Sequence, residues 1–203
     1  MQNQYDVTII MVRPATHPKA LTALERSLAN DPALLACWYS EIGALNQILI
    51  IRTINDPTAA VESRMAMLKS KDPFGVGEFM TGMTMDTFVA FDFLSPMQPA
   101  PLGPCFEVRS YILKDGGLAP TIELWRKAVP ARSRISPVLT AMTSVTGAVT
   151  RLTHIWPYKS VEERGRFRAK AAAEGVWPPP GGPDHIAAQQ VDIFFPAPFS
   201  PLC

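Results

Sequence analysis

Two pairs of matching stretches in this chain indicate that it contains an internal duplication. Residues 43–52 read GALNQILIIR and residues 147–156 read GAVTRLTHIW. A second match, in the same order along the chain, sets residues 98–102 (QPAPL) against residues 195–199 (FPAPF). Chance similarity of proline- and alanine-rich text is the alternative. Two matches in the same order favour duplication. Self-similarity of this kind indicates a fold built from two copies of one structural unit.

The order of the predicted elements repeats as well. Apolar alternation, capping residues and turn residues predict βαββαβ twice. In the first half the strands are expected over residues 5–12, 34–39, 45–54 and 85–94, and the helices after Thr16 and Asp56, with Val61, Met65 and Leu68 on the inner face of the second helix. In the second half the strands are expected over residues 106–113, 136–145, 150–156 and 188–195, with a helix over 118–129 and another from the capping box of Ser160 and Glu163. Pro157 is expected to end the strand before it.

A βαββαβ unit is the ferredoxin-like arrangement, an antiparallel four-stranded sheet with both helices on one face. The bare face of each sheet has to be covered. We therefore predict an α+β fold in which two tandem ferredoxin-like units, residues 1–98 and 99–203, pack sheet to sheet as an intrachain α/β barrel. The proline-rich linker over residues 95–104 is expected to be stiff. This geometry predicts a cavity between the sheets or at their mouths, and we expect an intersheet cavity that binds a small organic molecule.

Composition narrows the possible partners. The net charge of +1 gives no bulk attraction to nucleic acid or to an anionic membrane. No apolar run reaches the roughly 18 residues of a membrane span, and no signal peptide is evident at the start. The three cysteines are odd in number and widely spaced, which favours a reduced, cytoplasmic setting. A homodimer is a further possibility, because the outer faces of the helices and the sheet edges carry few charges.

One strand combines charged and aromatic side chains. Glu107, Arg109 and Tyr111 share one face, and Phe106 and Val108 share the other. We expect the apolar face to meet the helices and the polar face to line the intersheet cavity. Two interpretations remain open. One is a structural salt bridge, with the tyrosine hydroxyl hydrogen-bonded to backbone. The other is an anion- or carbonyl-binding pocket in which the guanidinium of Arg109 donates two hydrogen bonds to the ligand.

A second strand adds His154 and Trp156, followed by Tyr158. His154 is either a core histidine or a polar anchor, general base or axial haem ligand. The aromatic residues are either core anchors or a ligand wall. Asn46, near the start of its strand, is a possible further polar contact. The predicted ligand-binding residues are therefore Arg109, Tyr111, His154, Trp156 and Asn46.

The second half resembles the NIPSNAP family, within the dimeric α/β barrel superfamily. The resemblance covers nearly all of residues 105–202 and rests on Glu107-x-Arg109-x-Tyr111, the helix with Trp125, His154-x-Trp156-x-Tyr158, Glu162-Glu163-Arg164 and the closing Pro196–Leu202 segment. The first half resembles the family less. It keeps Asn46 and Arg64 but has Asp6-Val-Thr-Ile-Ile in place of the charged strand. The resemblance implies a ferredoxin-like fold used in pairs, and it implies no settled reaction.

Other chemistries lack their sequence patterns. The histidines and cysteines do not show zinc-ligand spacing, and the phosphate-binding glycine loop and the Gly-x-Ser-x-Gly elbow are missing from the sequence. The basic run over residues 164–170 reads as a solvated helix face. The sequence predicts no metal and no cofactor. Two function classes remain: a small-molecule binding or structural barrel protein, and a cofactor-free enzyme of the oxygenase, isomerase or cyclase type acting on an aromatic or polyketide-like substrate.

Overall fold

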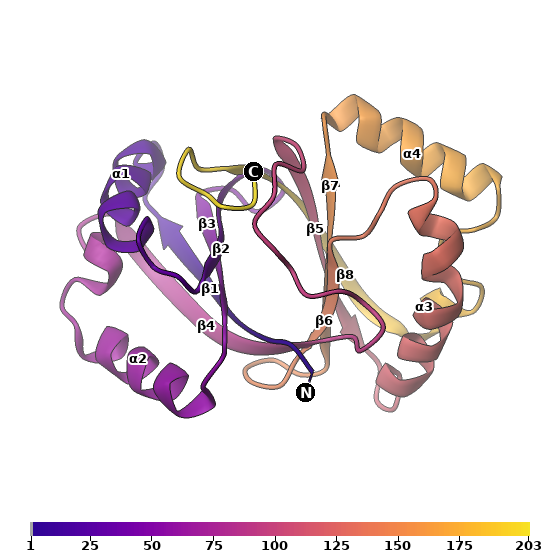
Figure 1. Ribbon diagram of the computed structural model, residues 1–203, viewed down its shortest axis with the longest axis horizontal. Coiled ribbons are helices and arrows are strands. Elements are labelled where there is room, and N and C mark those ends of the chain that lie inside the picture. Colours follow the sequence, from indigo (N-terminus) through magenta and orange to yellow (C-terminus); the bar gives the residue numbers. More distant parts are fainter. Residues whose placement is uncertain (1) are drawn as a thin grey trace.

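The computed structural model describes residues 2–203, and its strands close into one barrel (Figure 1). The elements of the first half are β1 (Gln4–Val12), α1 (His17–Leu28), β2 (Leu34–Ile42), β3 (Gln47–Thr53), α2 (Pro57–Lys69), the short 3-10 helix η1 (Pro73–Gly75) and β4 (Met80–Ala90). Those of the second half are β5 (Cys105–Leu113), α3 (Leu118–Ser133), β6 (Thr140–Ser144), β7 (Arg151–Tyr158), α4 (Val161–Ala173), the 3-10 helix η2 (Gly182–His185) and β8 (Ile186–Pro196).

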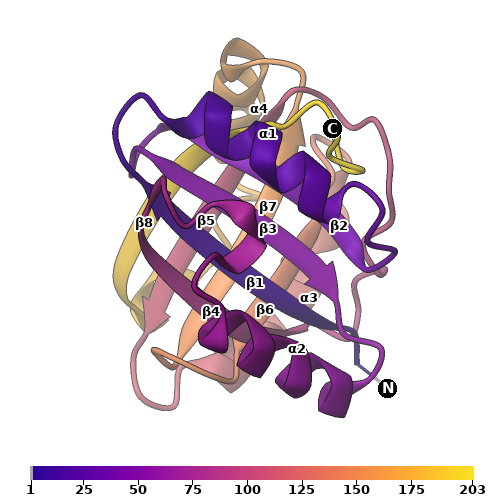
Figure 2. The same ribbon diagram turned by 90° about the vertical axis from the view of Figure 1, so that its left-hand side faces the viewer.

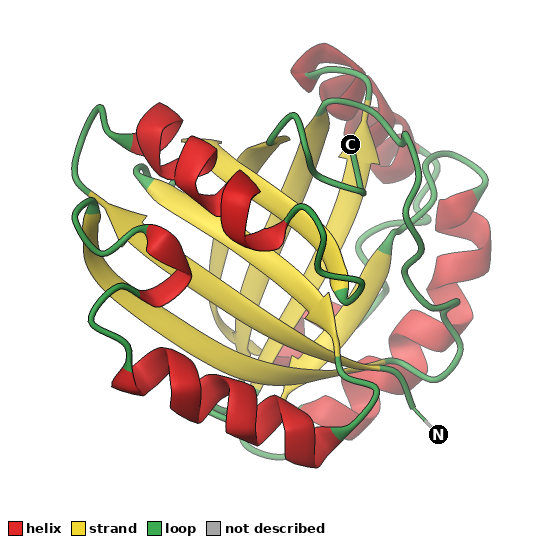
Figure 3. Ribbon diagram, turned by 60° about the vertical axis from the view of Figure 1, so that its left-hand side comes forward, coloured by secondary structure: helices red, strands yellow, loops and turns green. Residues whose placement is uncertain are grey.

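The strand order around the barrel is β1-β3-β2-β8-β5-β7-β6-β4. Each half contributes four neighbouring strands in the same relative order, and the two sheets join where β2 pairs with β8 and β4 with β6. Helices α1 and α2 cover the outside of the first-half strands, and α3 and α4 cover the second (Figures 1 and 2). Figure 3 shows the same layers, with the helices outside the strands. The predicted fold of two ferredoxin-like units closed into an intrachain α/β barrel is confirmed.

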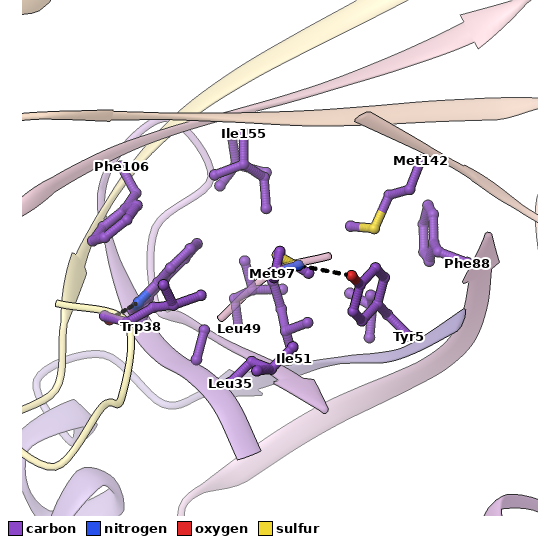
Figure 4. Packing of buried hydrophobic residues seen from close by; sticks show 14 of the residues in the cluster. Tyr5, Leu35, Trp38, Leu49, Ile51, Phe88, Met97, Phe106, Met142 and Ile155 are labelled. Carbon is purple, nitrogen blue, oxygen red and sulfur yellow. Dashed lines mark hydrogen bonds between the residues drawn. The ribbon is translucent and has the colours of Figure 1, made fainter. Parts of the chain in front are cut away.

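The interior of the barrel is an apolar core to which both halves contribute (Figure 4). Trp38 from β2 stacks on Phe106 from β5 with 4.0 Å between ring centroids. Val108 and Ile155 belong to the same cluster of buried residues. The apolar face of β5 therefore points into the barrel, and its polar face points towards the helices. The predicted orientation of this strand is wrong, because the closed barrel takes the more apolar face inside.

The inner face of α2 also differs from the prediction. Val61, Met65 and Leu68 are 60%, 46% and 66% exposed. Arg64 faces the sheet instead, and its Nε donates to Asp6 Oδ2 at 2.7 Å. With this partly buried ion pair on the sheet side of α2, the apolar side chains lie on the outer side of the helix.

Strand β7 does not end at Pro157. It continues to Tyr158, with Pro157 opposite Phe106 of β5. The N–H of Leu139 donates to the carbonyl of Ile155, so this edge of β7 faces β6. Strand β6 begins only at Thr140, opposite Ile155. The nitrogen of Pro157 therefore points beyond the start of β6, and no ladder hydrogen bond is lost.

Within residues 2–203, no helix is both long enough and apolar enough to cross a membrane.

Candidate functional site

Four of the five predicted site residues lie together on the outer, helix-facing side of the second-half sheet. In the register of β5 and β7, Arg109 lies opposite His154 and Glu107 lies opposite Trp156. Tyr111 follows two residues after Arg109 on the same face. Because these residues lie on neighbouring strands of a rigid sheet, the fold fixes their relative positions without mobile loops.

Asn46, the fifth residue, lies elsewhere. It occupies the hairpin between β2 and β3 with φ of 59°, and its carbonyl accepts a hydrogen bond from the N–H of Val12 at 2.9 Å. Asparagine is one of the few non-glycine residues that adopt this conformation readily. The geometry therefore gives Asn46 a role in the turn and does not place it at this site.

A fully buried carboxylate organises the charges at the site. Glu107 Oε1 accepts hydrogen bonds from Arg164 at 2.6 Å, from Arg109 at 2.9 Å and from Arg168 at 3.5 Å. Arg164 and Arg168 are four residues apart on α4, so both reach the sheet from one helix face. Three guanidinium groups share one carboxylate. The cluster therefore keeps an excess of positive charge.

The start of α4 sets the positions of these arginines. The hydroxyl of Ser160 accepts a hydrogen bond from the N–H of Glu163 at 3.1 Å, and Glu163 Oε2 accepts one from the N–H of Lys159 at 2.7 Å. These bonds form the expected helix cap. Where the helix begins determines which side chains reach Glu107.

Arg109 is held firmly as a cation. Its Nη1 is bonded to Glu107, and its Nε donates to the hydroxyl of Tyr111 at 2.7 Å. Burial opposes the charge, yet the contacts with Tyr111 and Glu107 leave the pKa of Arg109 raised. The salt-bridge interpretation is thus part of the structure, although the tyrosine hydroxyl bonds to Arg109 and not to backbone.

A cavity of about 450 Å³ borders this cluster. Its lining includes Arg109 and Tyr111 from β5, Thr121 and Trp125 from α3, and Arg168 from α4, together with the loop that begins at Trp177. The rings of Trp125 and Trp177 meet edge to face at 4.7 Å between centroids. A cavity of this volume is in the range that holds small organic ligands, about 300–1,000 Å³.

The predicted intersheet cavity is far smaller. The space inside the barrel, between residues such as Val7, Phe88 and Ile155, measures about 60 Å³. A water molecule takes about 30 Å³ of liquid volume, so this space suits roughly two waters. The open cavity of the second half therefore lies outside the barrel, between the sheet and its helices.

His154 lies behind the cavity wall. It is completely buried, and its ring contacts those of Tyr111 and Trp125 at centroid distances of 4.8 and 4.7 Å. Its Nδ1 accepts a hydrogen bond from Trp156 Nε1 at 2.7 Å, so the neutral tautomer carries its proton on Nε2. Because it is not exposed, His154 is poorly placed to act as a general base or haem ligand in the cavity. The contacts suit a residue that orients Tyr111 and Trp125.

We predict that His154 makes the protein less stable in mild acid. Burial, with help from Arg109 and Arg168, holds the pKa of His154 well below 6.5. In the unfolded chain the same group binds a proton below about pH 6.5, so its stabilising effect is full above that pH and is lost as pH falls below it. The free energy of unfolding should drop by about 1 kcal/mol between pH 6.5 and 5.5. Urea unfolding at both pH values measures it, and His154→Phe should remove this part of the loss. An equal loss in the variant would contradict the assignment.

Trp156 is also a structural residue. It is 2% exposed, and the guanidinium of Arg132 lies 4.4 Å from its ring centroid. Arg132 is itself buried and donates to the carbonyl of Ser136 at 3.0 Å. Trp156 therefore supports the aromatic wall from behind and does not border the cavity.

Of the five predicted site residues, Arg109 and Tyr111 line the cavity. The lining residues that the sequence did not identify include Thr121, Trp125, Arg168 and Trp177. Arg168 carried a signal, because it matches Arg64 in the internal repeat. Thr121 lies one helical turn before Trp125, so it shares that face of α3. Trp177 begins a proline-rich loop, and nothing in its sequence context indicated that it folds over the sheet.

The first half keeps the ion pair, but its open pocket, of about 500 Å³, is lined by Arg52 and Phe74 and does not include Asp6 or Arg64. Asp6 of β1 lies opposite Arg52, as Glu107 lies opposite Trp156 in the second half. The space above the first-half sheet contains Phe74, which belongs to the same buried cluster as Ile10 and Ile50. Phe74 has φ of 57°, uncommon for a bulky residue, and its carbonyl accepts a hydrogen bond from Ser27 at 2.7 Å. The segment between α2 and β4 thus packs Phe74 against the first-half core, and the same residue lines the pocket there.

Across residues 2–203, no group of three or more histidine, cysteine, aspartate or glutamate side chains is arranged to hold a metal ion.

Comparison with known sequences gives a family-model match in the second half and longer alignments with relatives, which extend into the first half. A family model described as NIPSNAP matches residues 106–201. A protein of Dictyostelium discoideum named Protein NipSnap homolog is 25% identical over 152 residues, which are 70% of this chain and 65% of that protein. The aligned chain therefore spans less than two thirds of that relative's own length.

Two solved structures share the fold of the whole chain. A proposed monooxygenase from Lactobacillus acidophilus matches with a TM-score of 0.67 and 10% identity, over 96% of this chain and 93% of that one. An anthrone oxidase-like protein matches with a TM-score of 0.67 and 10% identity, over 97% of this chain and 92% of that one. At this level of identity the likeness is one of fold alone.

Proposed function

We propose that the chain binds a small aromatic anion in the cavity outside its barrel. The proposal starts from its membership of the NIPSNAP family through residues 106–201. The observation that carries this proposal is the charge imbalance around Glu107. Arg109 and Arg168 both border the cavity, and they share a single carboxylate with Arg164. A carboxylate or phenolate ligand supplies the missing negative charge and accepts charge-assisted hydrogen bonds from these groups.

The rest of the cavity suits an aromatic ring. Trp125 and Trp177 form part of its wall, at an angle of 87° to one another. Aromatic side chains offer a large apolar surface and prefer offset or edge-to-face contacts with a further ring. A ligand with an aromatic body and one anionic end fits both parts of the cavity.

Arg109→Leu should weaken this binding by about 10- to 100-fold, because a hydrogen bond to a charged group contributes about 1.5–3 kcal/mol. The probe is 2-naphthoate, titrated into the intact chain and followed by tryptophan fluorescence or calorimetry. Arg126→Leu is the matched control, since Arg126 is an arginine 40% exposed at its side chain and paired with Asp92. Neutral 2-naphthalenemethanol should not distinguish the variants. Equal affinity for naphthoate in Arg109→Leu and in the unchanged chain would count against the proposal.

A second candidate is a cofactor-free enzyme of the oxygenase type acting on an aromatic or polyketide-like substrate. The observation that favours it is the fold shared with the proposed monooxygenase and the anthrone oxidase-like protein. Oxygen uptake with anthrone as substrate tests it. An oxygen uptake faster than in buffer alone, reduced in Arg109→Leu but not in Arg126→Leu, supports an enzyme. An uptake equal to that in buffer leaves ligand binding as the function.

A further inference from the structure

We propose that the outer face of α2 is the surface through which two copies of this chain associate. In the dimer the two α2 helices lie antiparallel, related by a two-fold axis near Met65. The proposal assigns a surface to the predicted homodimer and does not depend on any ligand. It rests on an apolar stripe along α2 and on the charges beside that stripe.

The stripe consists of Val61, Met65 and Leu68, all of them exposed. Their spacing of four and three residues puts them on one face of the helix. Figures 2 and 3 show α2 on the outside of the first-half sheet, with no other element over its outer side. Apolar side chains that are exposed next to one another indicate an interaction surface, whereas single exposed ones need no explanation.

The second half provides an internal comparison. Arg64 of α2 matches Arg168 of α4, 104 positions later, and each is bonded to a carboxylate of the sheet beneath its helix. At the same offset, the three stripe positions correspond to small, exposed residues of α4: Gly165, Ala169 and Ala172. The two helices therefore turn the same face outwards, and α2 presents large apolar side chains where α4 does not. Covering a sheet does not require these side chains, so they point to a contact outside the barrel.

The charges beside the stripe indicate that the partner is a second copy. Glu62 and Lys69 are exposed and lie seven residues apart, so they share one flank of the stripe about two turns from each other. Within residues 2–203, neither has an ion-pair partner. A flank with a carboxylate near one end and an ammonium near the other is complementary to the same flank turned end for end.

One two-fold axis satisfies both the apolar and the charged positions. The point midway between Val61 and Leu68 and the point midway between Glu62 and Lys69 both lie within one residue of Met65. An axis at Met65 therefore packs Val61 against Leu68 of the second copy. It also pairs Glu62 with Lys69 of the second copy, and the symmetry repeats both contacts, as in other two-fold dimers.

The length of the helix limits the strength of this association. α2 has 13 residues and is therefore about 20 Å long at 1.5 Å per residue. Two such helices in contact bury less than the roughly 1,200 Å² of a standard stable interface. We therefore expect a reversible dimer that dissociates on dilution, with a dissociation constant on the order of 10–100 μM.

Sedimentation velocity of the intact chain, from about 5 to 500 μM, tests the proposal. The average mass should rise from that of one chain towards that of two. Met65→Glu should raise the dissociation constant at least ~10-fold, because it brings two carboxylates together at the axis. Ala169→Glu, at the corresponding position of α4, is the matched control and should leave the constant unchanged. Both positions are exposed and glutamate favours helices, so circular dichroism should show both variants folded.

Charge reversal tests the antiparallel arrangement. Glu62→Lys and Lys69→Glu should each weaken the dimer by about 5-fold, because each places like charges opposite one another. An equal mixture of the two single variants should regain the affinity of the unchanged chain, since every lysine of one copy then faces a glutamate of the other.

Three results would overturn the proposal. A chain that stays monomeric over the whole concentration range leaves the α2 face to a partner of another kind. A dimer that survives Met65→Glu, or that Ala169→Glu weakens equally, uses a different surface. A mixture of the two charge variants that associates no more tightly than either alone rules out the antiparallel pairing.

Discussion

Glu107→Gln should destabilise the protein by about 3–5 kcal/mol, the usual result of removing one partner from a buried ion pair. Glu107 is completely buried and is the shared acceptor of three guanidinium groups. The neutral amide leaves Arg109 and the α4 arginines without their counter-charge. Urea unfolding at neutral pH measures the loss, and far-ultraviolet circular dichroism shows whether α4 stays folded.

Asp92→Asn is the control for this change. Asp92 also accepts a hydrogen bond from an arginine, Arg126, at 2.8 Å, but its side chain is 49% exposed. Exposed ion pairs contribute little because water and salt screen them, so stability should hardly change. Similar losses in Glu107→Gln and Asp92→Asn would show that the buried cluster has no special part in holding α4 to the sheet.

Residues 99–203 expressed alone should not give a stable monomer. In the full chain, Phe106, Val108 and Ile155 are covered by residues of the first half inside the barrel. Removing that half exposes this face and also frees the edges of β6 and β8 that pair with β4 and β2. Exposed apolar area and unpaired strand edges favour aggregation or pairing of two copies.

Light scattering after size-exclusion chromatography measures this result. We expect aggregates, or a homodimer in which one half-chain replaces the missing unit. A monomer that unfolds cooperatively would contradict the prediction and would also make each unit an independent domain. The division at residues 98 and 99 stays a prediction until this is measured, and the mass of the full chain tests the predicted homodimer.

The element order could be predicted from the sequence because its signals are local. The duplication, the alternation in β1 and β5, and the capping box of Ser160 and Glu163 each depend on residues close together in the chain. Together with the need to cover two bare sheet faces, these signals lead to the closed barrel.

The direction in which each face points could not be predicted, because alternation shows only which residues share a face. Phe106 and Val108 were expected to meet helices, as apolar sheet faces often do. In the structure they fill the barrel, and Glu107 and Arg109 meet the helix side. Glu107 can be buried on the helix side because Arg164 and Arg168, more than 50 positions away in the chain, donate hydrogen bonds to its carboxylate. Nothing local to β5 marks these partners.

The cavity itself was predictable in part. Arg109 and Tyr111 were identified because charged and aromatic residues alternate on one strand. Thr121 was missed because a helix sequence does not show which residues border a cavity. The first half has a similar ion pair at Asp6, but the pocket on that side is lined by Arg52 and Phe74 and does not include the paired carboxylate. The two halves therefore differ in which side chains border their pockets.

The four tryptophans allow one measurement to locate the ligand. Trp38 lies in the barrel core, whereas Trp125, Trp156 and Trp177 lie on the helix side of the second half. The chain labelled with 5-fluorotryptophan and titrated with 2-naphthoate gives one fluorine resonance for each site, assigned by single Trp→Phe variants. We expect the resonances of Trp125 and Trp177 to shift with one common dissociation constant, while the resonance of Trp38 stays in place. A shift of Trp38 with the other three unchanged would place the ligand inside the barrel and contradict the account, as would the lack of any shift.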